Sequence, residues 1–105
     1  MSKADPAELF GALGDPRRLA IVERLADGKA RAIRDLGEGA GVTRQALTKH
    51  LKVLEHAGVL RSERVGREVR YAIEQRELAR AEAFLAHVRR QWSDALVRLK
   101  EHVER

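Results

Sequence analysis

The stretch that decides the fold is Gly41-Val42-Thr43-Arg44-Gln45-Ala46-Leu47-Thr48-Lys49-His50-Leu51-Lys52-Val53-Leu54-Glu55-His56-Ala57-Gly58-Val59-Leu60. It predicts one helix, because Thr43 is a good N-cap and Gly58 stands where a helix ends in a left-handed residue. Between them an apolar stripe recurs at steps of four and three, at Leu47, Leu51 and Leu54. The opposite side is polar and basic, with Arg44, Gln45, Thr48, Lys49 and Lys52. A helix with these two faces is suited to a phosphate-lined groove, and we interpret it as the recognition helix of a helix-turn-helix.

Three shorter helices are predicted upstream of this stretch. Two of them open on an Asp-Pro pair, in which Asp is the N-cap and Pro the first helical residue. They cover about residues 7–13 and residues 16–28. A third, short helix covers about residues 31–36, and the glycine-rich residues 37–41 form the turn before the recognition helix. The helix-turn-helix thus spans about residues 31–57.

After Gly58 the apolar period changes from 3.6 to 2, which is typical of strands. Residues 60–64 and 68–73 predict two strands of a hairpin with Gly66 at the bend. A hairpin directly after a recognition helix is a wing, here about residues 60–73. Arg64 and Arg67 flank the glycine and are suited to insertion toward a minor groove.

The last predicted element is a long helix over about residues 75–104, without an internal proline or glycine. Apolar residues recur every seven positions, which gives more apolar surface than three short helices can cover. A second copy of the chain is the expected cover, so we predict a homodimer. The predicted interface residues, including two on the first helix, are Leu9, Phe10, Leu78, Leu85, Val88, Trp92, Leu96 and Leu99.

The net charge of +5 is concentrated in one part of the sequence. Residues 43–70 carry seven basic and three acidic side chains, whereas residues 1–42 balance at seven against seven and residues 71–105 at seven against six. Such a local excess favours a polyanionic partner, and double-stranded DNA is the partner that we predict. The few aromatic residues argue against base-stacking RNA-binding sheets.

Composition also excludes several classes of protein. With 105 residues the chain is expected to form a single domain. It has no cysteine, which excludes disulfides and thiolate metal sites. No run of eighteen apolar residues is present, and the start of the chain does not resemble a signal peptide, so we predict a cytoplasmic protein that does not span a membrane. No Ser-His-acid pattern or phosphate loop favours an enzyme, and no cofactor is predicted.

The four histidines and the arginine pair of the second helix have less specific interpretations. We interpret His50 as a hydrogen-bonded structural residue and His56 as a surface residue near a helix end. A metal site would need residues of both subunits, and none is predicted; the candidate ligands would be His87 and His102 with Asp94 or Glu101. The pair at Arg17 and Arg18 is interpreted as solvated surface, with contact to the DNA backbone as the alternative.

The order of these elements resembles the ArsR-type winged-helix transcriptional regulators over almost the whole chain. The residues that carry the resemblance are 10–21 (FGALGDPRRLAI), 43–54 (TRQALTKHLKVL), 57–60 (AGVL) and 66–67. The resemblance implies a mainly α fold with a small β-hairpin, a winged helix-turn-helix that dimerises through its first and last helices. It also implies that the recognition helix binds the major groove of a palindromic operator and that the protein represses transcription.

The departures from the family pattern concern metal. Metal-sensing members carry a cysteine pair in the third helix, or Asp/His and His/Glu ligands on the final helix. Neither pattern is present here. The chain is more similar to a cysteine-free branch that carries Arg-x-Trp-x-x-x-Leu-x-x-Leu on the last helix, here at residues 90–99.

We therefore predict a homodimeric, sequence-specific regulator of transcription that binds an inverted repeat and acts as a repressor. An activator would bind DNA in the same way, and an unknown effector is left open. The alternative is a protein-interaction module that has the winged helix without specific DNA binding. The basic helix and wing argue against it, because a protein-binding face would be less positive and more aromatic.

Overall fold

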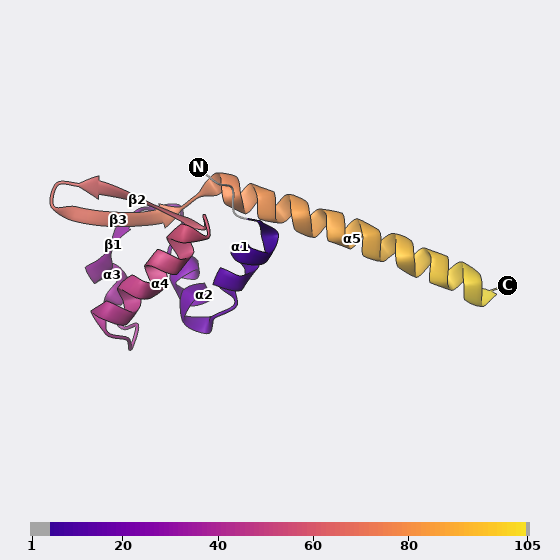
Figure 1. Cartoon of the computed structure of the whole chain (residues 1–105), viewed down its shortest axis with the longest axis horizontal. Coiled ribbons are helices and arrows are strands. Elements are labelled where there is room, and N and C mark those ends of the chain that lie inside the picture. Colours follow the sequence, from indigo (N-terminus) through magenta and orange to yellow (C-terminus); the bar gives the residue numbers. More distant parts are fainter. Residues whose placement is uncertain (1–4, 105) are drawn as a thin grey trace.

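The computed structural model describes residues 5–104, and Figure 1 shows their arrangement. The elements are, in chain order, α1 (Pro6–Leu13), α2 (Pro16–Arg24), β1 (Arg31–Ala32), α3 (Ile33–Gly37), α4 (Arg44–His56), β2 (Leu60–Val65), β3 (Glu68–Ile73) and α5 (Gln75–Glu104). Helices α1 to α4 pack together beside a small antiparallel sheet, and α5 leads away from them (Figure 1). The predicted fold class, mainly α with a β-hairpin, is confirmed.

The predicted helix caps are present. The carboxylate of Asp5 accepts a hydrogen bond from the backbone amide of Glu8 at 2.8 Å. The carboxylate of Asp15 accepts one from the backbone amide of Arg17, also at 2.8 Å. Just after the end of α4, Gly58 has a φ of +83°, a backbone conformation that favours glycine. This turn lets the amide of Val59 donate to the Leu54 carbonyl at 3.0 Å, which closes α4 and sends the chain into β2.

The sheet has the strand order β1-β3-β2, with all neighbours antiparallel. The hairpin register runs from Leu60 opposite Ile73 to Val65 opposite Glu68. The wing is thus confirmed, with β2 one residue longer than predicted. Gly66, with a φ of +64°, opens the two-residue connection between the strands.

Two predicted boundaries were wrong. The third helix was expected from about Arg31, but Arg31 and Ala32 form a short strand on the open edge of β3, and α3 starts at Ile33. This pairing satisfies backbone groups of β3 that β2 does not reach. The second helix was expected to continue to near Gly28, but it ends at Arg24.

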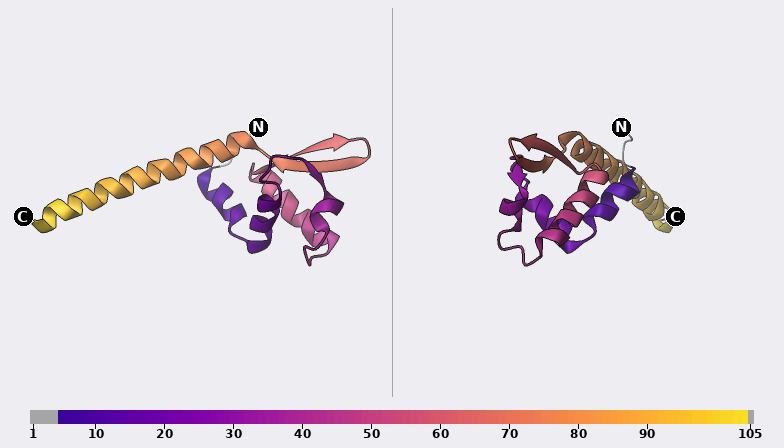
Figure 2. Two further views of the ribbon diagram at one scale, coloured as in Figure 1. Left: turned by 180° about the vertical axis from the view of Figure 1, so that it is seen from behind. Right: turned by 60° about the vertical axis from the view of Figure 1, so that its left-hand side comes forward.

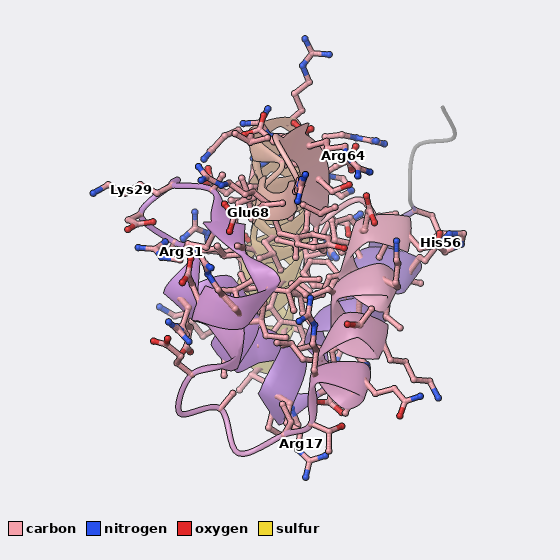
Figure 3. The ribbon with its side chains drawn as sticks, turned by 90° about the vertical axis from the view of Figure 1, so that its left-hand side faces the viewer. Arg17, Lys29, Arg31, His56, Arg64 and Glu68 are labelled. Carbon is pink, nitrogen blue, oxygen red and sulfur yellow. The ribbon has the colours of Figure 1, made fainter. Side chains whose placement is uncertain are left out.

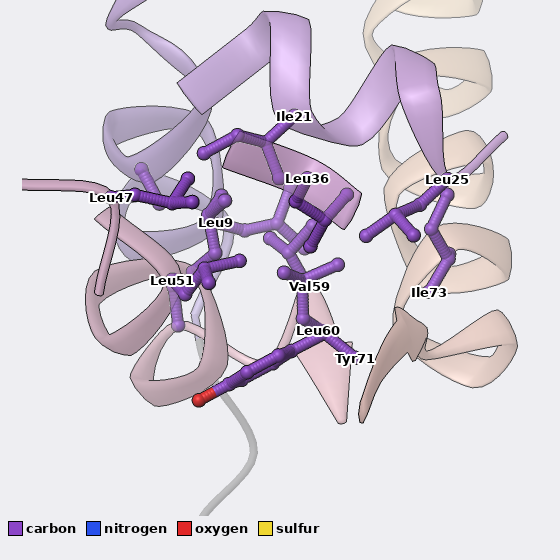
Figure 4. Packing of buried hydrophobic residues seen from close by; sticks show 13 residues of the cluster. Leu9, Ile21, Leu25, Leu36, Leu47, Leu51, Val59, Leu60, Tyr71 and Ile73 are labelled. Carbon is purple, nitrogen blue, oxygen red and sulfur yellow. The ribbon is translucent and has the colours of Figure 1, made fainter. Parts of the chain in front are cut away.

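The core lies where α1, α2, α3 and α4 meet the sheet (Figure 4). All three leucines of the α4 stripe are buried to 1% exposure or less. They pack in one cluster with residues from every other helix except α5, whose Leu78 and Ala81 only border it. The cluster members with the largest fully buried side chains are Leu25, Leu36, Leu47, Leu51, Leu54, Val59 and Tyr71.

Helix α5 extends far from this core (Figures 1 and 2), and the molecule measures 67 × 30 × 22 Å. Its first turns pack beside α1, where the rings of Phe10 and Phe84 have centroids 5.8 Å apart. None of its residues is buried. In the part of the chain that the structure describes, no helix has the length and apolar character needed to cross a membrane.

Replacement of Leu51 by alanine should lower the free energy of unfolding by about 2–5 kcal/mol, because the side chain is fully buried and the cavity cannot fill. Urea denaturation followed by circular dichroism measures the loss. Val53→Ala is the matched control on the same helix; since Val53 is 37% exposed, we expect a loss below about 1 kcal/mol. Equal losses in both variants would contradict the assigned orientation of α4.

Candidate nucleic-acid interface

The outer side of α4 is set by its buried leucines. Gln45, Lys49 and Lys52 are spaced four and three residues apart, so they form one line on the helix, and all three are exposed. Their side lies away from Leu47, Leu51 and Leu54, which face the core. The structure therefore brings these three predicted contact residues together on one exposed face.

The amino end of α4 uses its hydroxyl groups locally. The Thr43 hydroxyl accepts from the amide of Ala46 at 3.0 Å, as predicted for an N-cap. The Thr48 hydroxyl donates to the carbonyl of Arg44 at 2.8 Å. Each oxygen keeps a free lone pair, and Arg44 is exposed beside them.

One acidic residue that the sequence did not single out connects α4 to the wing. Glu55 accepts a hydrogen bond from the Ser62 hydroxyl on β2, and its carboxylate lies 3.9 Å from the ammonium of Lys52. The spacing of Lys52 and Glu55 is a signal for a helical pair. The bond to Ser62 left no signal, because it depends on how β2 packs against α4.

The wing presents its two predicted arginines at the connection between β2 and β3. Arg64 and Arg67 are both exposed, and within residues 5–104 neither side chain forms an ion pair or a hydrogen bond. Figure 3, which looks at the wing end of the molecule, shows Arg64 on the hairpin above α4.

Of the two arginines at the start of α2, Arg18 has a different role from the one predicted. The guanidinium of Arg18 donates to the carbonyl of Ala12 at 2.6 Å and to that of Gly11 at 3.5 Å. It thus satisfies carbonyls at the end of α1, a role that neither the surface nor the DNA interpretation included. Arg17 is exposed at the amino end of α2 (Figure 3).

The carboxylate that caps α2 has a perturbed pKa. The amide of Arg17 donates to Asp15, and this hydrogen bond, aided by the amide and charge of Arg18, lowers the pKa of Asp15 below its usual value. The cause is that the charged carboxylate is the better acceptor.

The histidines do not gather into a site. His50 is half-buried beside a cleft of about 600 Å³ between α2, the turn before α4 and α4 itself. Its ring forms no hydrogen bond within residues 5–104, so that part of its interpretation is not supported. Across the same described residues, no group of three or more His, Asp or Glu side chains is placed to hold a metal ion.

The predicted interface residues divide into two groups. Trp92 is 66% exposed, and it lies on one apolar side of α5 with Leu85, Val88, Leu96 and Leu99. Leu9, in contrast, is 4% exposed and belongs to the core of the single chain, which leaves little of its side chain for a partner to contact. Phe10 and Leu78 are half-buried against the same core, at the end of α5 nearest to it.

The arrangement of α2, α3 and α4 with the β2–β3 hairpin is a winged helix-turn-helix. A helix-turn-helix domain model matches residues 13–63. The chain is 40% identical over 72 residues to the HTH-type transcriptional repressor SmtB of Mycobacterium tuberculosis, in a match that covers 69% of this chain and 53% of SmtB. It therefore spans about half the length of that relative.

Solved structures match more of the chain. An ArsR-like transcriptional regulator from Rhodococcus sp. RHA1 has a TM-score of 0.80 and 33% identity, over 91% of this chain and 90% of that one. The homodimeric winged helix-turn-helix DNA-binding domain of a possible ArsR-family regulator from Mycobacterium bovis has a TM-score of 0.65 and 28% identity, over 81% and 78%. The chain belongs to the ArsR-type family of helix-turn-helix transcriptional regulators.

Acid should weaken the cap of α2. Because the folded-state pKa of Asp15 is depressed, its contribution to stability is present above the unfolded pKa of about 3.9 and is lost as the pH falls through the folded value. In Asp15→Asn the amide still caps the helix but does not titrate. We expect urea midpoints of wild type and Asp15→Asn to converge as the pH is lowered from 5 to below about 3.9. Asp94→Asn on α5 is the control. A wild-type advantage that grows in acid would contradict this account.

Proposed function

We propose that this protein is a homodimeric, sequence-specific DNA-binding regulator that represses transcription from an inverted-repeat operator. The observation that carries the proposal is that basic side chains on two sides of the molecule differ in how many of them form ion pairs with acids. The outer side of α4 and the tip of the wing carry basic groups that face solvent, whereas three arginines on the opposite side, Arg31, Arg34 and Arg70, contact acids.

On the opposite side, seen at the left of Figure 3, short contacts with acids neutralise part of the positive charge. Arg31 donates to both oxygens of Asp27, at 2.8 and 2.7 Å, and these bonds hold the pKa of Asp27 well below its usual range. Arg34 and Arg70 each lie 3.1 Å from the carboxylate of Glu68. These contacts reduce the positive charge on that side, where Lys29 is exposed and forms no ion pair within residues 5–104.

The side formed by α4 and the wing has fewer such contacts. Within residues 5–104, no ion pair involves Arg44, Lys49, Arg64 or Arg67, and Lys52 has only the 3.9 Å contact with Glu55. These groups can therefore exchange their counterions for DNA phosphates. In the proposed complex Arg44 and Gln45 contact base edges, Lys49 and Lys52 contact phosphates, and the wing arginines reach toward the minor groove.

The exposed side of α5 supports the homodimer. Five large apolar side chains there are 42–66% exposed in the single chain, and water would meet them unless a second copy covered them. The M. bovis relative with this fold is homodimeric, which is consistent with such a cover. A two-fold pair would place its recognition helices about 34 Å apart, one turn of DNA. The alternative, a protein-interaction module, is disfavoured by the basic surface.

The proposal is tested by titrating the protein with DNA from upstream of its own coding sequence, with scrambled DNA as competitor, from low to physiological salt. We expect binding of two protomers per site that resists the competitor and weakens steeply with salt. Weak binding that the scrambled DNA removes equally would contradict it.

Arg44→Ala should relax the preference for the operator over scrambled DNA, because a lost base contact costs about 1–3 kcal/mol of discrimination. Lys52→Ala should weaken binding to both DNAs alike and reduce the slope of log K against log salt by about 1.8, which is about 0.9 for each subunit of the dimer. Fluorescence anisotropy over a salt series separates the two effects. If Arg44→Ala lowers both affinities equally, Arg44 does not contact a base.

Trp92→Glu should dissociate the dimer, because it would place a charge within the apolar contact. Val97→Glu is the matched control: Val97 is 56% exposed, but it lies five residues from Trp92 and so about 140° around α5. Sedimentation velocity should show a monomer for the first variant and a dimer for the second. A dimer in both would place the interface elsewhere.

A further inference from the structure

A groove of about 430 Å³ runs between α1 and the later part of α4. Its floor is apolar and small, with Gly11 and Ala12 of α1 and Val53 and Ala57 on the α4 side. Its titratable lining is mostly basic and comes from three helices. The one acid among the lining residues is Glu8 of α1, and the basic residues are Arg18, Lys49, Lys52 and His56.

His56 continues the line of predicted DNA contacts on α4. The residues Gln45, Lys49, Lys52 and His56 are spaced by four, three and four, which keeps all of them on one side of the helix. The His56 side chain is 85% exposed, and Figure 3 shows it pointing away from the body of the molecule. The sequence interpretation of His56 as a plain surface residue did not use this alignment.

Glu8 opposes the basic groups in the groove. Its carboxylate lies 3.6 Å from Nε2 of His56, and its side chain is 44% exposed. The guanidinium of Arg18 donates to the carbonyls at the end of α1, and within residues 5–104 it forms no ion pair with Glu8. An anion that enters the groove thus meets the two lysines and His56 on α4, with Glu8 as the competing anion.

We propose that this groove between α1 and α4 receives a backbone phosphate of the bound DNA, that protonated His56 contacts this phosphate, and that Glu8 competes with it. The proposal rests on the DNA-binding function proposed above. Imidazole is the side chain whose charge changes between pH 5 and 8, so this contact depends on pH. A complex that holds His56 protonated binds more protons than the free protein, and its affinity therefore rises as the pH falls.

The test is the salt dependence of operator binding at pH 5.5 and pH 8, measured on the full chain. Each phosphate contact adds about 0.9 to the slope of log K against log salt. Because the proposed dimer has two His56 side chains, we expect a wild-type slope that is steeper by about 1.8 at pH 5.5. His56→Gln should show the shallower slope at both pH values, and His56→Lys the steeper slope at both. His87→Gln, on α5, should behave as wild type.

Glu8 is tested by removal of its charge. Glu8→Gln should raise affinity for operator and scrambled DNA about sevenfold at pH 8, because each of the dimer's two Glu8 charges, about 7 Å from a phosphate in water, accounts for about 2.7-fold. Glu101→Gln changes the net charge equally on distant α5 and should leave affinity unchanged.

Equal slopes for the wild type at both pH values, or a pH difference that persists in His56→Gln, would overturn the role of His56. If the wild-type protein still binds the operator in the presence of scrambled competitor DNA, either of these results overturns only the role of His56, and the proposed regulator function stands. Wild-type protein that shows no preference for the operator overturns both proposals.

Discussion

The burial of one row of leucines on α4 is the constraint on which the rest of the structure depends. Leu47, Leu51 and Leu54 are each exposed by 1% or less and hold the helix in a fixed rotation about its axis. A turn of the helix by one residue would rotate it by about 100° and bring polar groups into the core. The same burial therefore fixes which side chains face outward, and the position of the candidate interface follows from the packing of the core.

Features encoded by neighbouring residues were predictable from the sequence. The caps at Asp5, Asp15 and Thr43, the end of α4 at Gly58 and the hairpin around Gly66 all depend on contacts within a few residues. Each has a residue type that few others can replace, because it needs a side-chain acceptor or a positive φ. For the same reason α1, α4, α5 and both wing strands were predicted close to their observed bounds.

Features that depend on distant parts of the chain were not predictable. The strand at Arg31 and Ala32 exists because β3 has an open edge, and β3 begins more than thirty residues later. Arg18 binds carbonyls six and seven residues before it, across the corner between α1 and α2. Leu9 carries an apolar side chain that suits a core as well as an interface, and only the packing decides between them. The hydrogen bond between Ser62 and Glu55 also depends on tertiary packing, here of β2 against α4.

Charge shows most clearly why a sequence count has to be combined with geometry. The sequence located an excess of +4 in residues 43–70, yet this segment includes Arg70, which is paired with Glu68, as well as Arg64, which is not paired within the described residues. Arg34 lies outside the segment and also contacts Glu68. A partner responds to the field at its own position, which short ion pairs reduce and solvated side chains maintain. In the proposed complex, the pairing of Arg31, Arg34 and Arg70 with acids favours approach of DNA to α4 and the wing tip, where Arg44, Lys49, Arg64 and Arg67 have no ion pair within residues 5–104.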